Sequence, residues 1–479
     1  MSSVNGEVTN ITVWSNMNNL VRWASNDRYD SNGVRPSRRL PVFAFLMRYP
    51  LFLLAFGPPI FRSQAGIDAT KGQIDIWAFL QVIWLGIVAF RAIRRLTRTE
   101  SILIPRQIRS ILLIALILGL LFLASAAYSP SRPVSVAYSI LYFVTLMCVM
   151  EFIVDVYHNP PDWMQCIFQL RLIALLLFAL VILTIPFNPS LVLVGGVGGG
   201  MRILGYAVAP LPVICPMIAL ISTYSLLHSL EPRSRATVFM MVGVAGTLLT
   251  RARGAEFSLL FVLILIGIEW ARTSKRSAYA FISVCLASAL LFGAAVATVG
   301  AERIWNFINR KQSAEGIASA SGRTDVWRFV VHYCISHPLG MGYIAGFRDI
   351  FREYFELGIR VNVTGIGNAH NSYVQVLADA GWLALALYLI LMVRITALGW
   401  RFAKMQTIVA SGSGMIDRHA MRCALALLIM HFVQGFDAAD AVIPLRTAFY
   451  IQNIIVAIIL GDSTRLLVAS RARNYSIAK

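Results

Sequence analysis

The stretch 110-SILLIALILGLLFLASAAY-128 carries no charged residue over its nineteen positions. A helix that crosses the hydrocarbon core of a bilayer needs roughly 17–25 residues that are mostly apolar. Comparable windows recur from about residue 41 to residue 461. Because backbone groups at that depth find no water, such windows can cross a membrane only as helices. The sequence therefore predicts an all-α polytopic membrane protein.

The composition of the chain supports that prediction. Hydrophobic residues make up 58% of the 479 residues and charged residues only 14%, whereas soluble domains carry about a quarter of charged residues. A water-soluble fold is excluded on this basis. The apolar windows predict about 12 transmembrane helices, over residues 41–61, 73–90, 110–128, 133–156, 166–185, 205–228, 236–250, 254–271, 278–298, 381–398, 420–434 and 447–461.

Lysine and arginine residues predict how these helices are oriented, because short cytoplasmic loops are enriched in them. One set of alternating loops, together with both terminal segments, carries 24 basic residues, and the other set of short loops carries seven. Both termini are therefore predicted to be cytoplasmic. The same bias accounts for most of the formal net charge of +19, so no nucleic-acid partner is inferred.

One connection, residues 299–380, is much longer than the others and is predicted to lie on the outward side. Long loops in compact proteins tend to be functional or disordered. Helical spacing of apolar residues predicts two short amphipathic helices in it, one through Val326, Trp327, Val330, Val331 and Cys334 and one through Ile350, Phe351, Tyr354 and Phe355. The predicted organisation is a cytoplasmic tail, nine helices, this loop with the catalytic motifs, three helices and a second cytoplasmic tail, over residues 1–40, 41–298, 299–380, 381–461 and 462–479.

The first polar motif, 250-TRARGAEF-257, separates two apolar windows on the outward side. It places Arg251, Arg253 and Glu256 within six residues, and ionisable groups near the membrane are costly unless they are paired or functional. We expect Gly254 to permit a very tight turn between the two helices. The motif fits either a functional site or two interfacial arginines, one of them neutralised by Glu256.

The second motif, 321-SGRTDVWRF-329, has the pattern of a helix start. Ser321 or Thr324 is the expected cap, with Asp325 in the first turn. Arg323 then lies at the positive end of that helix, where an anion would meet both its guanidinium and free backbone N–H groups. The alternative is a simple ion pair between aspartate and arginine at the helix start.

The third motif, 367-GNAHNSYVQVLADAGW-382, leads into the tenth apolar window. Asn371 or Ser372 is expected to cap a helix that runs on into this window, which places His370 at the helix N-terminus. Since a helix N-terminus disfavours imidazolium, His370 should stay neutral near pH 7 and able to accept a proton, as a general base must. A lone histidine, however, is more often structural.

Other polar features are weaker candidates. Asp437 and Asp440 lie in the last outward loop, but their spacing does not give the adjacent pair that holds a metal–nucleotide complex. The segment 195-GGVGGG-200 lacks the strand and helix of a nucleotide-binding turn and fits flexible backbone near a cavity. No metal-ligand cluster is evident, and we predict no cofactor. Cys334 is the one cysteine outside the apolar windows, so no disulfide framework is expected.

Taken together, the motifs resemble a known family. These are the Arg-Gly break, the Ser-Gly-Arg helix start followed by 337-HPLGMGY-343, and 368-NAHNSY-373 leading into 380-AGWLALAL-387. They resemble the O-antigen ligase and O-antigen/exopolysaccharide polymerase family of bacterial inner-membrane glycosyltransferases. The likeness is strongest over about residues 236–400, and 202-RILGY-206 is also similar to a segment that precedes a middle helix in such proteins.

This resemblance implies a reaction and a set of site residues. Such enzymes move a glycan from undecaprenyl pyrophosphate to an acceptor hydroxyl at the periplasmic face, without metal or nucleotide. By resemblance, His370 is the base, and Arg253 and Arg323 bind the donor pyrophosphate, with Arg251 as an alternative phosphate ligand. The physical reading agrees, because guanidinium groups stabilise the charge of a leaving pyrophosphate and a neutral imidazole can take the hydroxyl proton. A single displacement of this kind inverts the anomeric centre. Supporting roles are expected for Asn371, Glu256 and Asp325.

Alternatives differ in the acceptor or in the class of protein. The loop 299–380 has eight basic and seven acidic residues, without the basic excess that suits a phosphorylated lipid A core, which favours a polymerase over a ligase. A secondary transporter with twelve helices is a third reading, although the connection 229–235 is short for the link between two six-helix halves. The expected partners are the lipid-linked glycan, an acceptor glycan or lipid A core, membrane lipid and other proteins of polysaccharide assembly.

Overall fold

The computed structural model of the protein describes residues 42–56, 76–98, 104–158, 161–187, 189, 193–195, 201–203, 211–300, 302–303, 323–347, 350, 369–409, 415–438, 441–444 and 446–477. The helices in these ranges are α2 (Val42–Arg48), α3 (Pro50–Leu53), η1 (Leu54–Phe56), α4 (Ile76–Arg98), α5 (Arg106–Ser125), α6 (Arg132–His158), α7 (Trp163–Thr184), α8 (Leu211–Leu227), α9 (Arg233–Thr250), α10 (Arg253–Ala271), α11 (Lys275–Val299), α14 (Arg323–Ser336), α16 (Ser372–Val409), α17 (Met415–Gln434) and α18 (Thr447–Ile477). Two short strands, β1 (Leu193–Gly195) and β2 (Met201–Ile203), complete them.

The helices confirm the predicted class of an all-α polytopic membrane protein. Each of the twelve predicted windows overlaps a helix. Among the described residues, seven helices are long and apolar enough to cross a membrane, and two further apolar helices are shorter, Leu211–Leu227 and His419–Gln434. The predicted total of twelve spans and the boundaries of the five predicted segments stay predictions.

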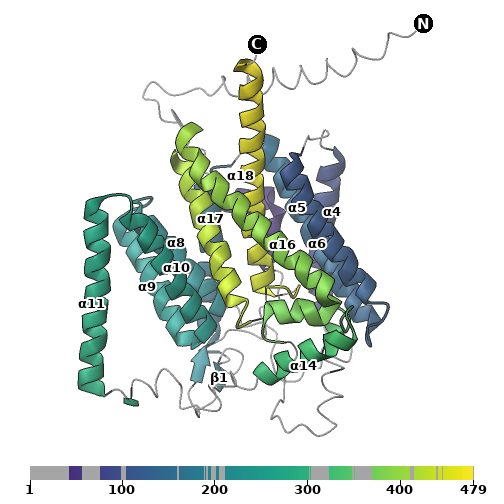
Figure 1. Ribbon diagram of the computed structural model, residues 1–479, viewed down its shortest axis with the longest axis horizontal. Helices are drawn as coiled ribbons and strands as arrows, with labels where there is room; N and C mark the ends of the chain where they lie inside the picture. Colours follow the sequence, from purple (N-terminus) through teal and green to yellow (C-terminus); the bar gives the residue numbers. More distant parts are fainter. Residues whose placement is uncertain are drawn as a thin grey trace.

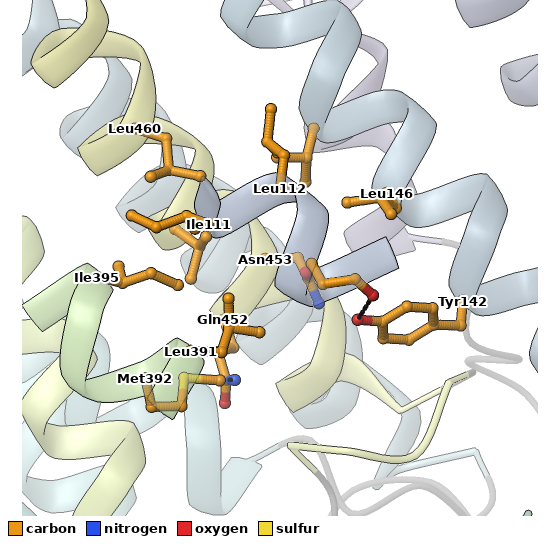
Figure 2. Close-up of a pocket in the computed structure, with 13 residues that line it drawn as sticks. Ile111, Leu112, Tyr142, Leu146, Leu391, Met392, Ile395, Gln452, Asn453 and Leu460 are labelled. Atoms are coloured by element: carbon orange, nitrogen blue, oxygen red, sulfur yellow. Dashed lines mark hydrogen bonds between the residues drawn. The ribbon is translucent and has the colours of Figure 1, made fainter. Parts of the chain in front are cut away.

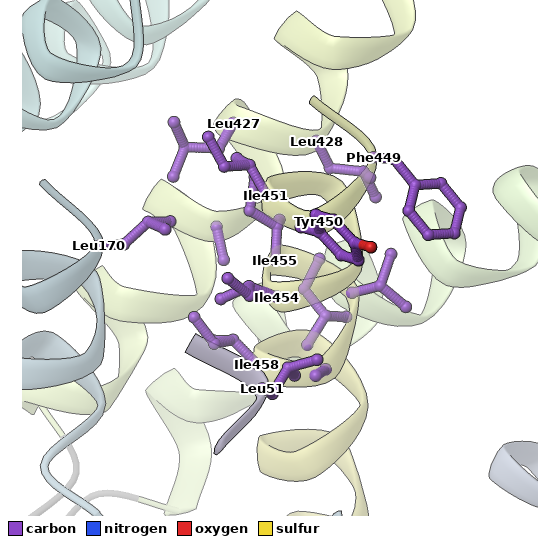
Figure 3. Close-up of a cluster of buried hydrophobic side chains, with 14 of the residues drawn as sticks. Leu51, Leu170, Leu427, Leu428, Phe449, Tyr450, Ile451, Ile454, Ile455 and Ile458 are labelled. Atoms are coloured by element: carbon purple, nitrogen blue, oxygen red, sulfur yellow. The ribbon is translucent and has the colours of Figure 1, made fainter. Parts of the chain in front are cut away.

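The bundle is built around α18. Within its apolar window, 94% of the residues are buried, against none in the window of α11. A helix that is apolar all round belongs in the interior of a bundle, and the isoleucines Ile451, Ile454 and Ile458 of α18 accordingly pack against side chains of α7 and α17 (Figure 3). Helix α18 packs mainly against α6, α16 and α17, while α5 packs on α16 and α8 on both α9 and α10.

A cavity of about 50 Å³ lies between α5, α6, α16 and α18 (Figure 2). Its walls are mostly aliphatic, with Tyr142, Gln452 and Asn453 as polar members. The Tyr142 hydroxyl donates to the carbonyl oxygen of Ala115 at 3.0 Å. None of the residues predicted to form the functional site lines this cavity.

One end of the bundle carries α14 and the strand β1, and the C-terminal end of α18 lies at the opposite end (Figure 1). We call the first the site end and the second the far end. The predicted amphipathic helix is confirmed as α14, which buries Val326, Val330 and Cys334. Val331 is 38% exposed and does not belong to that face. The second predicted amphipathic helix lies outside the described residues except for Ile350.

The glycine-rich segment is flanked by structure that its composition did not suggest. Strands β1 and β2 pair antiparallel, with Val194 opposite Arg202. An antiparallel pair of strands is not the strand followed by a helix of a nucleotide-binding turn, so the pair does not contradict the sequence interpretation. Strand β2 contacts α9, which brings Arg202 to the site end.

Candidate functional site

The three polar motifs lie together at the site end, on the N-termini of three helices. Arg253 is the first residue of α10, Arg323 is the first residue of α14, and His370 lies two residues before the start of α16. Each helix N-terminus has backbone N–H groups without a partner inside the helix, and it carries the positive end of the helix dipole. The sequence motifs thus become one region through the fold.

The side chain that joins them is Asp437, in the turn after α17. Its Oδ1 accepts a hydrogen bond and forms an ion pair with the guanidinium of Arg323. Its Oδ2 accepts from the backbone N–H of Gly254 at 3.0 Å, one residue beyond Arg253. One carboxylate therefore bridges the start of α14 and the start of α10.

The same turn also holds the start of α16. Asn371 Nδ2 donates to the carbonyl oxygen of Phe436 at 3.2 Å, and the backbone N–H of Ser372 donates to the carbonyl oxygen of Gly435 at 2.7 Å. The Ser372 hydroxyl donates to the carbonyl oxygen of Ala438 at 2.8 Å. We call this arrangement the Asp437 junction; it consists of residues 435–438 with Gly254, Arg323, Asn371 and Ser372.

His370 is held by the residues on both sides of it. Ala369 donates its N–H to Gln375 Oε1 at 2.8 Å and accepts from Trp327 Nε1 at 2.9 Å. Asn371 caps α16 by accepting from the N–H groups of Tyr373 at 2.9 Å and Val374 at 3.0 Å, so Asn371 is the predicted cap and Ser372 is not. His370 itself has a φ of 49°.

That backbone conformation is unusual for a residue with a Cβ atom. The left-handed region costs a non-glycine residue roughly 1–2 kcal/mol, and such residues concentrate at functional sites where the surroundings enforce them. Arg251 shares the feature, with a φ of 49° where α9 ends. Both positions belong to motifs that were singled out from the sequence.

The turn between α9 and α10 differs from the prediction. Gly254 was expected to provide the turn, but Arg251 adopts the left-handed conformation and Gly254 lies inside α10. A Cβ on Gly254 would lie 2.5 Å from the Cβ of Asp437. The glycine therefore allows the close approach of Asp437, a role that local sequence does not reveal.

The second motif is partly as predicted. Asp325 lies in the first turn of α14, and its ion pair is with Arg328 at 3.8 Å, between two exposed side chains. Thr324 was a possible cap, and this was wrong because it is the second residue of the helix. Ser321 and the other aspartate proposed from the sequence, Asp440, lie outside the described residues.

The three arginines of the site differ in how exposed they are. Arg251 is exposed, while Arg253 and Glu256 are half-buried on the first turn of α10. Arg323 has 29% of its side chain exposed and Asp437 has 38%. The ion pair at the junction is thus open to the outside.

The segment 337-HPLGMGY-343 anchors α14 to α16. It meets the point where α16 is broken, at Ala380 and Gly381. Trp382 donates its N–H to the carbonyl oxygen of Pro338 at 3.1 Å, and Met341 donates its N–H to that of Ala378 at 2.6 Å. A Cβ on Gly381 would lie 2.7 Å from the carbonyl carbon of Leu339. The segment 337–343 thus packs against the break in α16. This contact fixes the position of α14 relative to His370.

Two further contacts seal this anchor. The hydroxyl of Tyr128 donates to the carbonyl oxygen of Leu339 at 2.5 Å. The thiol of Cys334 points to the carbonyl oxygen of Leu377 at 3.5 Å, and burial raises its pKa to about 12. The buried Cys334 thiol therefore remains protonated, and Cys334 is a structural residue rather than a nucleophile.

Sequence reasoning missed several contributors to the site. Trp327, Gln375 and the turn 435–438 hold the motifs in place, and Asp437 was only a secondary candidate. Asp437 follows a glycine and an aromatic residue after a long apolar run, and this is the only local signal that it had. Among the described residues, no group of three or more His, Cys, Asp or Glu side chains could hold a metal ion.

These observations define the class of the protein as a multi-pass helical membrane protein with a cationic, histidine-bearing site at one end of its bundle. A family model described as O-antigen ligase matches residues 236–389. That range runs from α9 into α16 and contains Arg251, Arg253, Arg323 and His370, but it ends before Asp437.

The chain therefore carries the O-antigen ligase family domain, and the resemblance expected from the motifs is confirmed over these residues. The match supports a glycosyltransferase-like enzyme with a glycan-transfer function of the ligase or polymerase type. The O-antigen ligase family, which the chain resembles over these residues, implies a lipid-linked glycan donor and an acceptor. No curated protein matches the chain.

Proposed function

We propose that the protein transfers a glycan from undecaprenyl pyrophosphate to an acceptor hydroxyl at the site end, as an O-antigen or exopolysaccharide polymerase. The observation that carries the proposal is the Asp437 junction. Its carboxylate is held jointly by the Arg323 guanidinium and by the N-terminus of α10 at Gly254. A carboxylate and a phosphate are bound by the same groups, so this is a position suited to the pyrophosphate of the donor.

In this proposal, Arg253 and Arg323 bind the donor pyrophosphate. As the bond between the sugar and the pyrophosphate breaks, negative charge develops on the leaving group, and guanidinium groups and helix N-termini placed beforehand stabilise it. Arg251 lies two residues from Arg253, on the exposed side of the turn, and is the alternative ligand. Glu256 and Asp325, on the first turns of α10 and α14, support these arginines.

His370 is the proposed general base. It takes the proton from the acceptor hydroxyl while the hydroxyl oxygen attacks the anomeric carbon and the pyrophosphate leaves from the opposite side. One displacement inverts the anomeric centre, and neither a metal ion nor a nucleotide takes part. Asn371 supports the base by capping α16, which holds His370 beside the junction.

Asp437 is the proposed positioning residue of this site. Its two oxygens hold Arg323 and the start of α10 at a fixed separation before the donor arrives. Because the Arg323–Asp437 pair is partly exposed, a bound pyrophosphate can share the guanidinium without first paying for the removal of a buried partner.

The proposed location is the bacterial inner membrane, with the site end facing the periplasm and both termini in the cytoplasm. The distribution of lysine and arginine supports this orientation. The far end, where α18 ends (Figure 1), is the end that carries the basic connections. The partners are the lipid-linked glycan, the acceptor, membrane lipid and other polysaccharide assembly proteins.

The alternative acceptor is the lipid A core, which would make the protein a ligase. The test is to incubate the purified full-length protein in lipid nanodiscs with an undecaprenyl-pyrophosphate glycan, alone and then with lipid A core. Growth of the lipid-linked chain with donor alone is the result expected of a polymerase. Product that forms only with lipid A core would make it a ligase, and no transfer in either case, with the lipid donor bound, would overturn the proposal.

A further inference from the structure

Asp379 of α16 is a carboxyl group that is shielded from solvent. The residue is completely buried and lies directly before the break in α16 at Ala380 and Gly381. Its Oδ1 accepts two hydrogen bonds, while its Oδ2 has no hydrogen-bond partner among the described residues. Burying a carboxyl group costs free energy unless its hydrogen bonds compensate. An ionisable residue buried in a helix of a membrane protein is therefore a candidate for a functional role.

The first hydrogen bond of Asp379 leads to His370. Gln375 lies one turn before Asp379 on the same face of α16, and its Nε2 donates to Asp379 Oδ1 at 2.8 Å. Its Oε1 accepts at 2.8 Å from the backbone N–H of Ala369, directly before His370. An amide can accept from an N–H group and donate to a carboxyl oxygen at the same time, whereas a carboxylate can only accept. The side chain of Gln375 therefore connects the Asp379 carboxyl group to the backbone beside His370.

The second hydrogen bond leads to the chain that follows α14. The backbone N–H of Ile344 donates to the same Oδ1 at 2.9 Å, and the backbone N–H of Gly342 donates to the carbonyl oxygen of Asp379 at 3.1 Å. Ile344 has a φ of 61°, which is a genuine outlier for a β-branched residue. Asp379 thus fixes the chain at the end of the segment 337–343, which anchors α14.

Two residues with left-handed backbone are therefore connected to one carboxyl oxygen. Ile344 is bonded to it directly. His370, with a φ of 49°, is connected to it through Gln375 and the backbone of Ala369. Residues with a Cβ atom keep this conformation only where their surroundings enforce it. Because both connections converge on Oδ1, Asp379 sets the position of the His370 backbone relative to the chain that follows α14.

We propose that Gln375 and Asp379 are positioning residues for glycan transfer, which hold the His370 imidazole in reach of the acceptor hydroxyl. The inference rests on the proposed function, in which His370 is the base. A base must lie within hydrogen-bond reach of the proton that it takes, and a displacement of about 1 Å can lower a rate about a hundredfold. Both side chains are buried, so they act on the reaction through the backbone of His370 and not by contact with substrate.

A double-mutant cycle tests whether Gln375 acts through His370. Gln375→Met keeps the size of the side chain and removes both of its hydrogen bonds. In full-length protein in lipid nanodiscs with saturating undecaprenyl-pyrophosphate glycan, we expect kcat to fall about 10- to 100-fold. The dissociation constant for undecaprenyl pyrophosphate should stay unchanged. In a His370→Asn background, the same substitution should change the residual rate by less than about twofold, because no imidazole remains to be positioned.

Gln169→Met is the matched control for this cycle. Gln169 is a buried glutamine near the start of α7, and its replacement should leave kcat unchanged. A normal kcat for Gln375→Met would overturn the proposal. An equal loss of rate with and without the His370 imidazole would also overturn it, because Gln375 would then act independently of the base.

Two substitutions test whether the acceptor oxygen of Asp379 is the group that matters. Asp379→Asn keeps an oxygen in the position of Oδ1, whereas Asp379→Leu has a similar size and no acceptor. We expect kcat within about threefold of normal for the asparagine variant and a loss of at least about tenfold for the leucine variant. Equal kcat values for the two variants would show that the assigned role of Oδ1 is wrong. If Asp379→Leu does not fold, Asp379→Asn and the Gln375 cycle decide the outcome.

The same measurements separate this inference from the proposed function. Normal transfer by His370→Asn would remove the base of the proposed function, and the positioning role with it. Lost transfer in His370→Asn together with a normal kcat in Gln375→Met would remove the positioning role alone. The expected result is lost transfer in both single variants, with no further loss when they are combined.

Discussion

Arginine–carboxylate pairs occur at both ends of the bundle, but they differ in whether a ligand can reach the arginine. At the far end, Arg171 of α7 makes two bonds to Glu231, of 2.5 and 2.8 Å, and a third to Ser222, and its guanidinium lies between the rings of Phe168 and Phe239. The exposed fractions of the two ionised side chains are 3% and 7%. Because both side chains are buried, this pair is not accessible to a ligand.

At the site end, Arg323 and Asp437 are 29% and 38% exposed, and the carboxylate is shared with a helix N-terminus. The residues are of the same type, yet the pair is open and lies beside Arg253 and His370. The comparison teaches that burial of the guanidinium, rather than the presence of an ion pair, distinguishes a structural arginine from one that can bind substrate. The following predictions test this distinction.

The largest expected effect is on His370. Replacing it with asparagine removes the base and keeps a residue that tolerates the left-handed backbone. Loss of a general base lowers rates by about 10²- to 10⁴-fold, so His370→Asn should lose glycan transfer by that factor, measured with purified protein. His332→Ala, an exposed histidine of α14, is the matched control and should transfer at the normal rate. Normal transfer by His370→Asn would remove it from the mechanism.

Arg171→Ala should act on stability rather than on chemistry. It removes both bonds of Arg171 to the buried carboxylate of Glu231 and leaves the longer ion pair with Arg235 at 3.6 Å. Breaking a buried pair costs about 3–5 kcal/mol. We expect a lower thermal unfolding temperature in detergent and a lower yield in the membrane. The double variant Arg171→Met with Glu231→Met should recover much of this loss. An unchanged unfolding temperature for Arg171→Ala would show that the buried pair at the far end is not structural, which would contradict the distinction between the two ends.

Arg323→Ala should show the opposite pattern. The side chain is partly exposed, so folding should change little, while kcat/KM for the lipid donor should fall roughly 10- to 100-fold, which corresponds to one charge-assisted hydrogen bond at about 1.5–3 kcal/mol. Arg253→Ala should behave alike. Arg328→Ala, which removes an exposed arginine of the same helix, is the control and should leave kcat/KM unchanged. If Arg251→Ala lowers kcat/KM for the donor more than Arg253→Ala, then Arg251 rather than Arg253 is the pyrophosphate ligand.

Gly254→Ala should have a smaller effect. The new methyl group would meet Asp437, displace it from Arg323 and alter the spacing of the two arginines. We expect a several-fold loss in kcat/KM with an unfolding temperature close to normal. Gly86→Ala on α4, where no atom lies within 4 Å of the added Cβ, should keep full activity. A fully active Gly254→Ala protein would show that the close approach of Asp437 is dispensable.

The smallest effect is a pH dependence at the far end. Burial acts to raise the pKa of Glu231, but the hydrogen bond and charge of Arg171 outweigh it and lower that pKa. A carboxyl group whose pKa is lowered by folding stabilises the protein above its unfolded pKa, and this stabilisation is lost as the pH falls through the lowered value. The unfolding temperature should therefore fall in acid more steeply for the normal protein than for Glu231→Gln. Parallel curves would mean that the pair contributes nothing to stability.

The sequence predicted the class of fold and the side of the molecule to examine, because both depend on local composition. Apolar windows reveal helices wherever they occur, and the start of α16 was predictable because an Asn–Ser pair before an apolar run has the chemistry of a cap. The same reasoning failed for Gly254, whose role depends on a residue 183 positions away. It also failed for the partner of Arg323, since nothing in α14 indicates that a turn after α17 returns to it.

The candidate site was predicted as three motifs and not as one structure. Their convergence on Asp437, and the left-handed backbone at Arg251 and His370, come from tertiary contacts such as those of Ala369 with Trp327 and Gln375. A pattern along the chain carries no information about such contacts. It also could not indicate that 337-HPLGMGY-343 packs against the break in α16. In the sequence, this segment and the break at Ala380 and Gly381 each appear as an ordinary glycine-containing stretch.

The central claim is that the site end binds the donor pyrophosphate through its arginines and performs proton transfer through His370. The most direct test measures both the dissociation constant for undecaprenyl pyrophosphate and the rate of glycan transfer, in Arg323→Ala and in His370→Asn. We predict weakened binding with reduced transfer in Arg323→Ala, and normal binding with transfer almost abolished in His370→Asn. Weak binding in His370→Asn that accounts for its loss of transfer, or full binding in Arg323→Ala, would contradict the account.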